Sequence, residues 1–161
     1  MRVNLALRSM PAYVVRYPPE AMMTDSLHIV KLCVGAEAVD DLIRWQKERY
    51  PAGNPVHVTR MWPKREAEIL SGGSLYWVFK GLILARQRLL GFEERDHGDG
   101  IRRCGFVLER DVVLTHPMPR RPFQGWRYLA ATDAPQDLPK GRESEDLPPA
   151  LAAMLDEIGL R

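Results

Sequence analysis

Apolar and polar residues alternate along much of the chain, and this alternation predicts strands. The clearest example is the segment 74–80, in which Leu75, Trp77 and Phe79 fall on one side of an extended backbone. We expect a half-buried strand there, with its apolar side on the core. The motif at 97–100, HGDG, favours a tight hairpin. Further strands are predicted at 26–34, 56–60, 82–90, 101–108 and 112–116.

The segment 82–90 fits two kinds of element. Its Leu, Ala, Arg and Gln content favours a helix, whereas its position between a strand and the turn-rich 97–100 favours a second long strand. We assign it as a strand, which places Arg86 and Arg88 on one face.

Two helices are expected before the middle of the chain. Apolar residues at helical spacing over 36–50 predict the first of them. The second is short and begins at Pro63, because proline fits the first position of a helix. It continues to Leu70, and the glycines Gly72 and Gly73 then end it.

The last third of the chain is less regular. Three prolines and a glycine interrupt 117–129, so no regular structure is expected there. A short helical turn is predicted within 132–138. A terminal helix is predicted over 147–158, capped by Asp146. Its apolar stripe consists of Leu151, Leu155 and Ile158.

Strands in near sequence with helices inserted early predict an α+β fold. We expect a small, mostly antiparallel β-barrel or curled sheet with two inserted helices and a C-terminal helix. Residues 25–138 would form a single domain. Residues 1–24 are interpreted as a loosely ordered extension, or as the product of a start codon upstream of the natural one. Residues 139–161 are interpreted as a polar linker and the terminal helix.

Charge is unevenly distributed along the chain. The 161 residues carry a formal net charge of only +2, which by itself does not imply a nucleic-acid partner. However, residues 56–129 contain 13 Lys or Arg against 8 Asp or Glu, whereas 130–161 contain 3 against 7. The middle of the chain is therefore basic and its tail acidic. No apolar run is long enough to cross a bilayer, so we expect no membrane partner.

The residues typical of metal and redox sites do not form motifs. The four histidines are scattered without the spacing of a zinc site, and we expect no metal and no cofactor. Cys33 and Cys104 form no CxxC pair. We expect both to be buried small hydrophobic residues in a protein of the reducing cytoplasm.

The candidate site is an anion-binding groove. Lys64 and Arg65 would lie in the first turn of the second helix, where the helix dipole is already positive and free N–H groups attract anions. The alternative is that both side chains simply extend into water. Near 117–129, arginines alternate with rings that would either stack on bases or pin the loop to the core. The predicted groove is lined by Arg60, Lys64, Arg65, Lys80 and Arg86, is closed by Arg120, Arg121, Trp126 and Arg127, and offers Tyr76 or Trp126 for base stacking.

Several segments together resemble a known family. VHVTRMWPKR, GGSLYWVFKG, RQR, DGIRRC and RRPFQGWRYL are similar to segments of small, mostly alphaproteobacterial proteins, the domain-of-unknown-function family 1489. The resemblance covers Leu27 to Leu138 and leaves the tail after Pro139 outside. Because the family has no established activity, it implies no site residues. More remotely, the layout is similar to that of PUA and ASCH domains, which are compact β-barrels that bind RNA or modified nucleotides.

Three functional hypotheses follow from these residues. The leading one is an RNA- or nucleotide-binding module that uses the basic groove. The second is a small enzyme acting on a phosphorylated or nucleotide substrate, with His57 or Tyr76 as acid or base. A deep pocket holding a polar residue with a displaced pKa would favour this enzyme over a shallow groove. The third is a protein-interaction module in which the terminal helix binds a protein partner.

Overall fold

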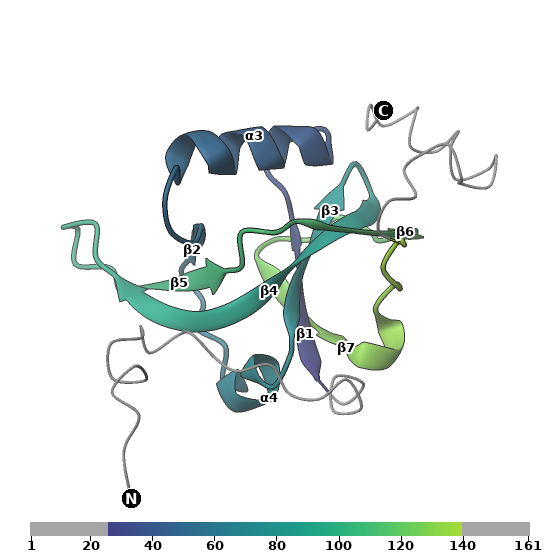
Figure 1. Ribbon diagram of the computed structural model, residues 1–161. Coiled ribbons are helices and arrows are strands. Elements are labelled where there is room, and N and C mark those ends of the chain that lie inside the picture. The colour runs from purple at the N-terminus through teal and green to yellow at the C-terminus, as the bar shows by residue number, and fades with distance from the viewer. Residues whose placement is uncertain (1–25, 140–161) are drawn as a thin grey trace, which may run out of the picture.

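A mixed sheet of seven strands forms the body of the protein (Figure 1). The computed structural model describes residues 26–139. The strands are β1 (Leu27–Leu32), β2 (Val56–Thr59), β3 (Ser74–Phe79), β4 (Leu82–Arg95), β5 (Arg103–Leu108), β6 (Val113–Pro119) and β7 (Trp126–Ala130). The helices are α3 (Val39–Arg49), α4 (Glu66–Leu70) and the short η1 (Ala131–Asp133). The α+β class and the curled sheet predicted from the sequence are confirmed.

The long strand β4 organises the sheet. The strand order is β2-β5-β4-β3-β1-β7, and β6 also pairs with β4. All pairs are antiparallel except β1 with β3. Over its 14 residues, β4 pairs first with β3 and β6 and then with β5, and its curve is visible in Figure 1. The ambiguous segment 82–90 is therefore a strand, as predicted, and it continues to Arg95.

Strand β3 is buried on both faces, so the prediction of a half-buried strand is wrong. All six of its residues are buried. Leu75, Trp77 and Phe79 pack into the larger hydrophobic cluster, whereas Tyr76 and Val78 pack into a second cluster on the other face. The side chains of Val30, Ile83 and Leu129, from three other strands of the curled sheet, complete this second cluster, so the face expected to be in solvent also belongs to the core.

Helix α4 is shorter than the sequence indicates. It begins at Glu66, and the prediction that it begins at Pro63 is wrong. Lys64 and Arg65 therefore precede the helix instead of forming its first turn, and the first turn contains Glu66 and Glu68. Acids at this end agree with the helix dipole, so the electrostatic mismatch expected from the sequence does not exist.

The connection from α4 to β3 requires a glycine. A Cβ atom on Gly73 would lie 2.2 Å from the carbonyl oxygen of Leu27 and 2.5 Å from that of Ile69. Both atoms belong to backbone and cannot move aside. The Gly73 N–H also donates to the Ile69 carbonyl, at an N–O distance of 2.6 Å. This close approach fixes α4 against the start of β1.

The segment 117–129 is more regular than predicted. Strand β6 continues through Pro117 to Pro119, and β7 begins at Trp126. The prediction of no regular structure is wrong because prolines are tolerated where a strand need not donate to a neighbour on both sides. The helical turn predicted within 132–138 is present in part, as η1. The N-terminal extension, the linker and the terminal helix lie outside the described residues.

Candidate functional site

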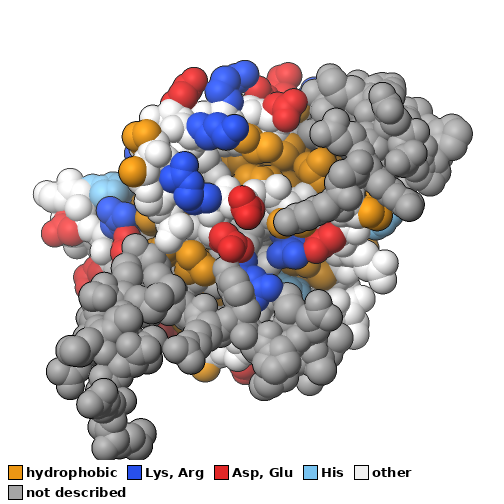
Figure 2. Space-filling model, in the orientation of Figure 1, with side chains coloured by type: hydrophobic (Ala, Val, Ile, Leu, Met, Phe, Trp, Pro, Cys, Tyr) orange, Lys and Arg blue, Asp and Glu red, His pale blue; other side chains and the backbone are white. Residues whose placement is uncertain are grey.

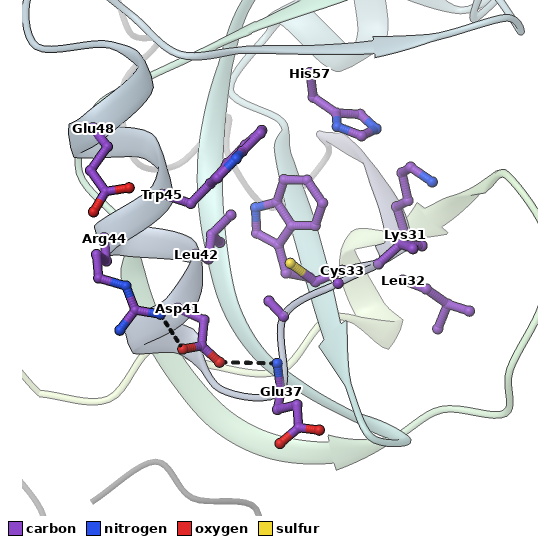
Figure 3. A pocket seen from close by; sticks show the side chains of 14 residues that line it. Lys31, Leu32, Cys33, Glu37, Asp41, Leu42, Arg44, Trp45, Glu48 and His57 are labelled. Atoms are coloured by element: carbon purple, nitrogen blue, oxygen red, sulfur yellow. Dashed lines mark hydrogen bonds and ion pairs between the residues drawn. The ribbon is translucent and has the colours of Figure 1, made fainter.

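A pocket opens between helix α3 and the sheet. Its volume is about 570 Å³, and we call it the α3 pocket. Its wall combines the end of β1 and the loop after it with α3, β2 and β3. The lining residues used below are Lys31, Cys33, Trp45, Glu48, His57 and Trp77. In Figure 3, Lys31 and His57 lie on one side of the pocket, and Trp45 and Glu48 project from the helix opposite.

A buried amide network fixes one wall of the α3 pocket. The Trp77 indole N–H donates to Gln87 Oε1 at 3.0 Å. The side-chain amides of Gln87 and Gln46 donate to each other at 3.0 and 2.7 Å, and Gln87 also donates to the Glu109 carbonyl. Gln46 is on α3 and Gln87 on β4, so this pair fastens the helix to the sheet and sets the orientation of the Trp77 ring.

His57 is neutral at physiological pH. Its ring meets the Trp77 ring edge to face, with centroids 5.3 Å apart. Burial lowers the pKa of His57 to about 4, and the nearby charge of Lys31 acts in the same direction. Its Nε2 atom is buried and has no hydrogen-bond partner among the described residues. The wall of the pocket therefore includes a neutral imidazole with an unbonded Nε2 atom.

Two other side chains of this pocket are also perturbed by burial. Burial lowers the pKa of the Lys31 ammonium, which has no ion-pair partner within residues 26–139. Burial raises the pKa of the Cys33 thiol to about 12, so this cysteine is protonated and unreactive at neutral pH. Within the described part of the chain, no three His, Cys, Asp or Glu side chains are placed to hold a metal ion.

A second, more open hollow lies beside the edge strand β7. We call its residues the arginine surface: Pro119, Arg120, Arg121, Pro122, Phe123, Arg127 and Tyr128. The guanidinium groups of Arg120 and Arg127 each lie 5.4 Å from the centroid of the Phe123 ring. Among residues 26–139, none of its three arginines forms an ion pair with a carboxylate.

Tyr128 joins Lys64 and Arg65 to this surface. Its hydroxyl accepts hydrogen bonds from the backbone N–H groups of Lys64, at 2.9 Å, and Arg65, at 3.4 Å. The Arg65 guanidinium lies 5.6 Å from the centroid of the Tyr128 ring and also pairs with Glu68. The N–H groups that were expected to attract an anion are thus bonded to a tyrosine, and neither Lys64 nor Arg65 is among the residues that line the hollow.

Two of the predicted cations lie elsewhere. Lys80 is at the β3–β4 turn, where its ammonium is 3.7 Å from the carboxylate of Glu37. Arg86 pairs with Asp137 at 2.6 Å and donates to Ser74 Oγ at 3.0 Å. The predicted groove is therefore not formed as one surface.

The predicted stacking rings are part of the core. Tyr76 is 5% exposed and Trp126 is 3% exposed. Trp126 also donates its indole N–H to the Met61 carbonyl, which holds the segment after β2 against β7. Arg60 precedes this contact and is exposed. Neither ring is open to a base in this structure, and the packing alternative considered for Trp126 is the one observed.

Sequence reasoning missed most of the α3 pocket. His57 was considered as an acid or base and Trp77 was placed on the core side of its strand, but no part in a site was predicted for Lys31, Trp45 or Trp77. The pocket forms because the β1–β3 and β2–β5 pairings bring three distant segments under one helix. One signal was present in the sequence: Trp45 lies off the apolar positions of the helix predicted over 36–50, and in the structure it is 45% exposed.

The fold and these two hollows define an α+β protein with a ligand-sized pocket and a basic sheet edge. Residues 29–161 match the family described as "Protein of unknown function (DUF1489)", and the chain belongs to that family. The match includes the tail after Pro139, which the resemblance in the sequence had left outside. No curated protein and no solved structure matches the chain. No helix within residues 26–139 is long and apolar enough to span a bilayer.

Proposed function

We propose that the protein binds RNA or a nucleotide through phosphate contacts at the arginine surface. The supporting observation is uncompensated charge: Arg120, Arg121 and Arg127 surround one hollow without a carboxylate partner in residues 26–139. By contrast, six other arginines within the described part of the chain pair with acids. They are Arg44, Arg65, Arg86, Arg95, Arg102 and Arg103. Acidic and basic side chains are likewise interspersed over the face drawn in Figure 2.

The arrangement around Phe123 suits a flexible, single-stranded ligand. Both guanidinium groups over this ring are held by cation–π contact, which reduces the freedom they lose on binding. Planar guanidinium groups bind phosphate oxygens in pairs and also offer surfaces on which bases stack. The backbone of Lys64 is bonded to Tyr128, which also lines the hollow.

This proposal retains the remote likeness to PUA and ASCH domains as part of the same hypothesis. A curled sheet with a basic edge would serve the same general task, RNA binding in the cytoplasm of a bacterium. The residues proposed to bind are fewer than the sequence predicted. Tyr76, Lys80, Arg86 and Trp126 are left out because of their burial or their partners.

The test is equilibrium binding of a labelled single-stranded RNA at two salt concentrations. Three phosphate contacts on a single strand predict a slope of log affinity against log salt of about −2. We expect the affinity of the Arg120→Gln/Arg121→Gln/Arg127→Gln variant for RNA at low salt to be lower by about ten-fold or more. We also expect the salt dependence of its affinity to be much weaker than that of the wild type.

The matched control removes the same charge from exposed positions on α3, as Arg44→Gln/Lys47→Gln/Arg49→Gln. We expect the control to retain most of the affinity and the slope of the wild type. Absence of binding at low salt, or equal losses in the two triple variants, would refute the proposal.

A second candidate, a small enzyme, is favoured by one observation. His57 has a displaced pKa and lines a true pocket. However, Glu37, Asp41 and Glu48 also line that pocket and disfavour a phosphorylated substrate. Tyr76 is not among the residues that line it, and burial raises the pKa of Tyr76 to about 12. The arginine surface is therefore the better-supported place for phosphate.

A further inference from the structure

The α3 pocket has the size and the apolar surface of a small-molecule site. Its volume of about 570 Å³ falls within the roughly 300–1,000 Å³ typical of such sites. Trp77 is 3% exposed and is held by Gln87, so it forms a rigid flat wall. Trp45 projects from α3 and remains 45% exposed, with the Arg49 guanidinium 5.3 Å from the centroid of its ring.

The other side of the pocket carries polar groups without partners. The Lys31 side chain is half-buried and forms no ion pair within residues 26–139, and the neighbouring His57 has a buried, unbonded Nε2 atom. A buried polar atom without a partner costs about 1–3 kcal/mol, a cost that a ligand oxygen or nitrogen would offset. Figure 3 shows the two side chains on the same side of the pocket, opposite Trp45.

The charges at the pocket limit the ligand class. Asp41 pairs with Arg44 and accepts hydrogen bonds from the backbone N–H groups of the two residues before α3, Glu37 and Ala38, at 3.1 and 3.2 Å. Glu37 pairs with Lys80. Glu48 has no ion-pair partner among the described residues. Among residues 26–139, Lys31 and Arg44 are the only cations that line the pocket, so it excludes a multiply charged phosphate but accepts a neutral or singly negative molecule.

We propose that the α3 pocket binds a small planar molecule of one or two fused rings that carries a carbonyl or carboxylate oxygen. The ring packs against Trp45 and Trp77, and the oxygen meets Lys31 and His57. This site is separate from the arginine surface. Lys31 and Trp77 are paired in register and face α3, whereas Arg127 is opposite Val30, whose side chain packs on the other face of the sheet.

The test uses three probes that share one ring: indole-3-carboxylate, indole-3-carboxamide and indole. Each is titrated into the full chain labelled with nitrogen-15, and the four indole N–H signals are followed by NMR. We expect the signals of Trp45 and Trp77 to shift and those of Trp62 and Trp126 to stay. The carboxylate is expected to bind most tightly and indole most weakly, because Lys31 recognises the charged group.

Two variants separate recognition of the oxygen from recognition of the ring. Lys31→Met should lower the affinity for indole-3-carboxylate about ten-fold, because a charge-assisted hydrogen bond is lost. The variant should then bind the carboxylate no more tightly than the carboxamide. Trp45→Ala should lower the affinity for all three probes without changing the order of their affinities. Lys47→Met, on the exposed face of α3, is the matched control and should leave all three affinities unchanged.

Each remaining outcome overturns the proposal. Shifts of all four indole signals, or of none at millimolar probe, would mean that the pocket is not the binding site. Equal affinities for the three probes, or a Lys31→Met variant that keeps the preference, would mean that no polar group is recognised. RNA binding at the arginine surface is measured separately and does not depend on this result.

Discussion

Replacing Gln87 by methionine should destabilise the protein far more than an average substitution. Gln87 is fully buried and makes four hydrogen bonds, which link Trp77, Gln46 and the carbonyl of Glu109. Methionine has a similar volume, so the change removes these bonds without opening a large cavity. It leaves the Trp77 N–H, the Gln46 amide and the Glu109 carbonyl without partners.

The expected loss in the free energy of unfolding follows from the polar groups that are left without hydrogen-bond partners. Gln46 is 7% exposed and Trp77 is 3% exposed, so water does not readily replace the lost partner. At about 1–3 kcal/mol for each buried unsatisfied group, two such groups give roughly 2–6 kcal/mol. This is a large fraction of the total stability of about 5–15 kcal/mol expected of a domain.

Urea denaturation followed by circular dichroism measures the loss in the free energy of unfolding. A double-mutant cycle shows how much of this loss comes from the interaction between Gln46 and Gln87. Gln46→Met alone should cost less, because Gln87 retains Trp77 and Glu109 as partners. The double variant should cost less than the sum of the two single variants, with a coupling of at least about 0.5 kcal/mol. Strict additivity, or a Gln87→Met loss under about 0.5 kcal/mol, would refute the role of this network in holding α3 to the sheet.

Two further predictions concern the frame of the fold and its response to pH. In urea titrations, Gly73→Ala should lower the free energy of unfolding by several kcal/mol more than Gly98→Ala, because only the Cβ added at Gly73 meets backbone atoms. Similar losses in the two variants would contradict the close approach of Gly73 to Leu27 and Ile69. Stability should fall as pH drops from about 6.5 to about 4. Burial holds the pKa of His28 and His57 near 4 in the folded chain, so the unfolded chain binds these protons first. His57→Asn should flatten this dependence, and an unchanged slope would show that His57 is not buried in its neutral form.

The positions of the strands could be predicted from the sequence better than the burial of their faces. Alternation located β1, β2, β3 and β5 because strand periodicity is a local property. It failed at β3 in one respect: the side chains expected in solvent, Tyr76 and Val78, meet a second cluster formed by residues from β1, β4 and β7. Burial on the second face depends on strand order, which local pattern does not contain.

The candidate site was predictable only in part, for a related reason. Arg120, Arg121 and Arg127 are close in sequence, so one loop and the start of β7 bring them together. Lys80 and Arg86 were grouped with them by charge alone, and their partners Glu37 and Asp137 lie 43 and 51 positions away in the sequence. The α3 pocket requires the parallel pairing of β1 with β3, which places Lys31 opposite Trp77.

Photochemical crosslinking of a bound single-stranded RNA, followed by mass spectrometry of the crosslinked peptides, tests the central claim most directly. We expect crosslinks to fall on the arginine surface at Phe123 and Tyr128, and on the adjoining segment 60–65. The Arg120→Gln/Arg121→Gln/Arg127→Gln variant should lose them. Crosslinks concentrated on α3 or on the β4–β5 hairpin, with none at 119–128, would contradict the assignment of nucleic-acid binding to this edge of the sheet.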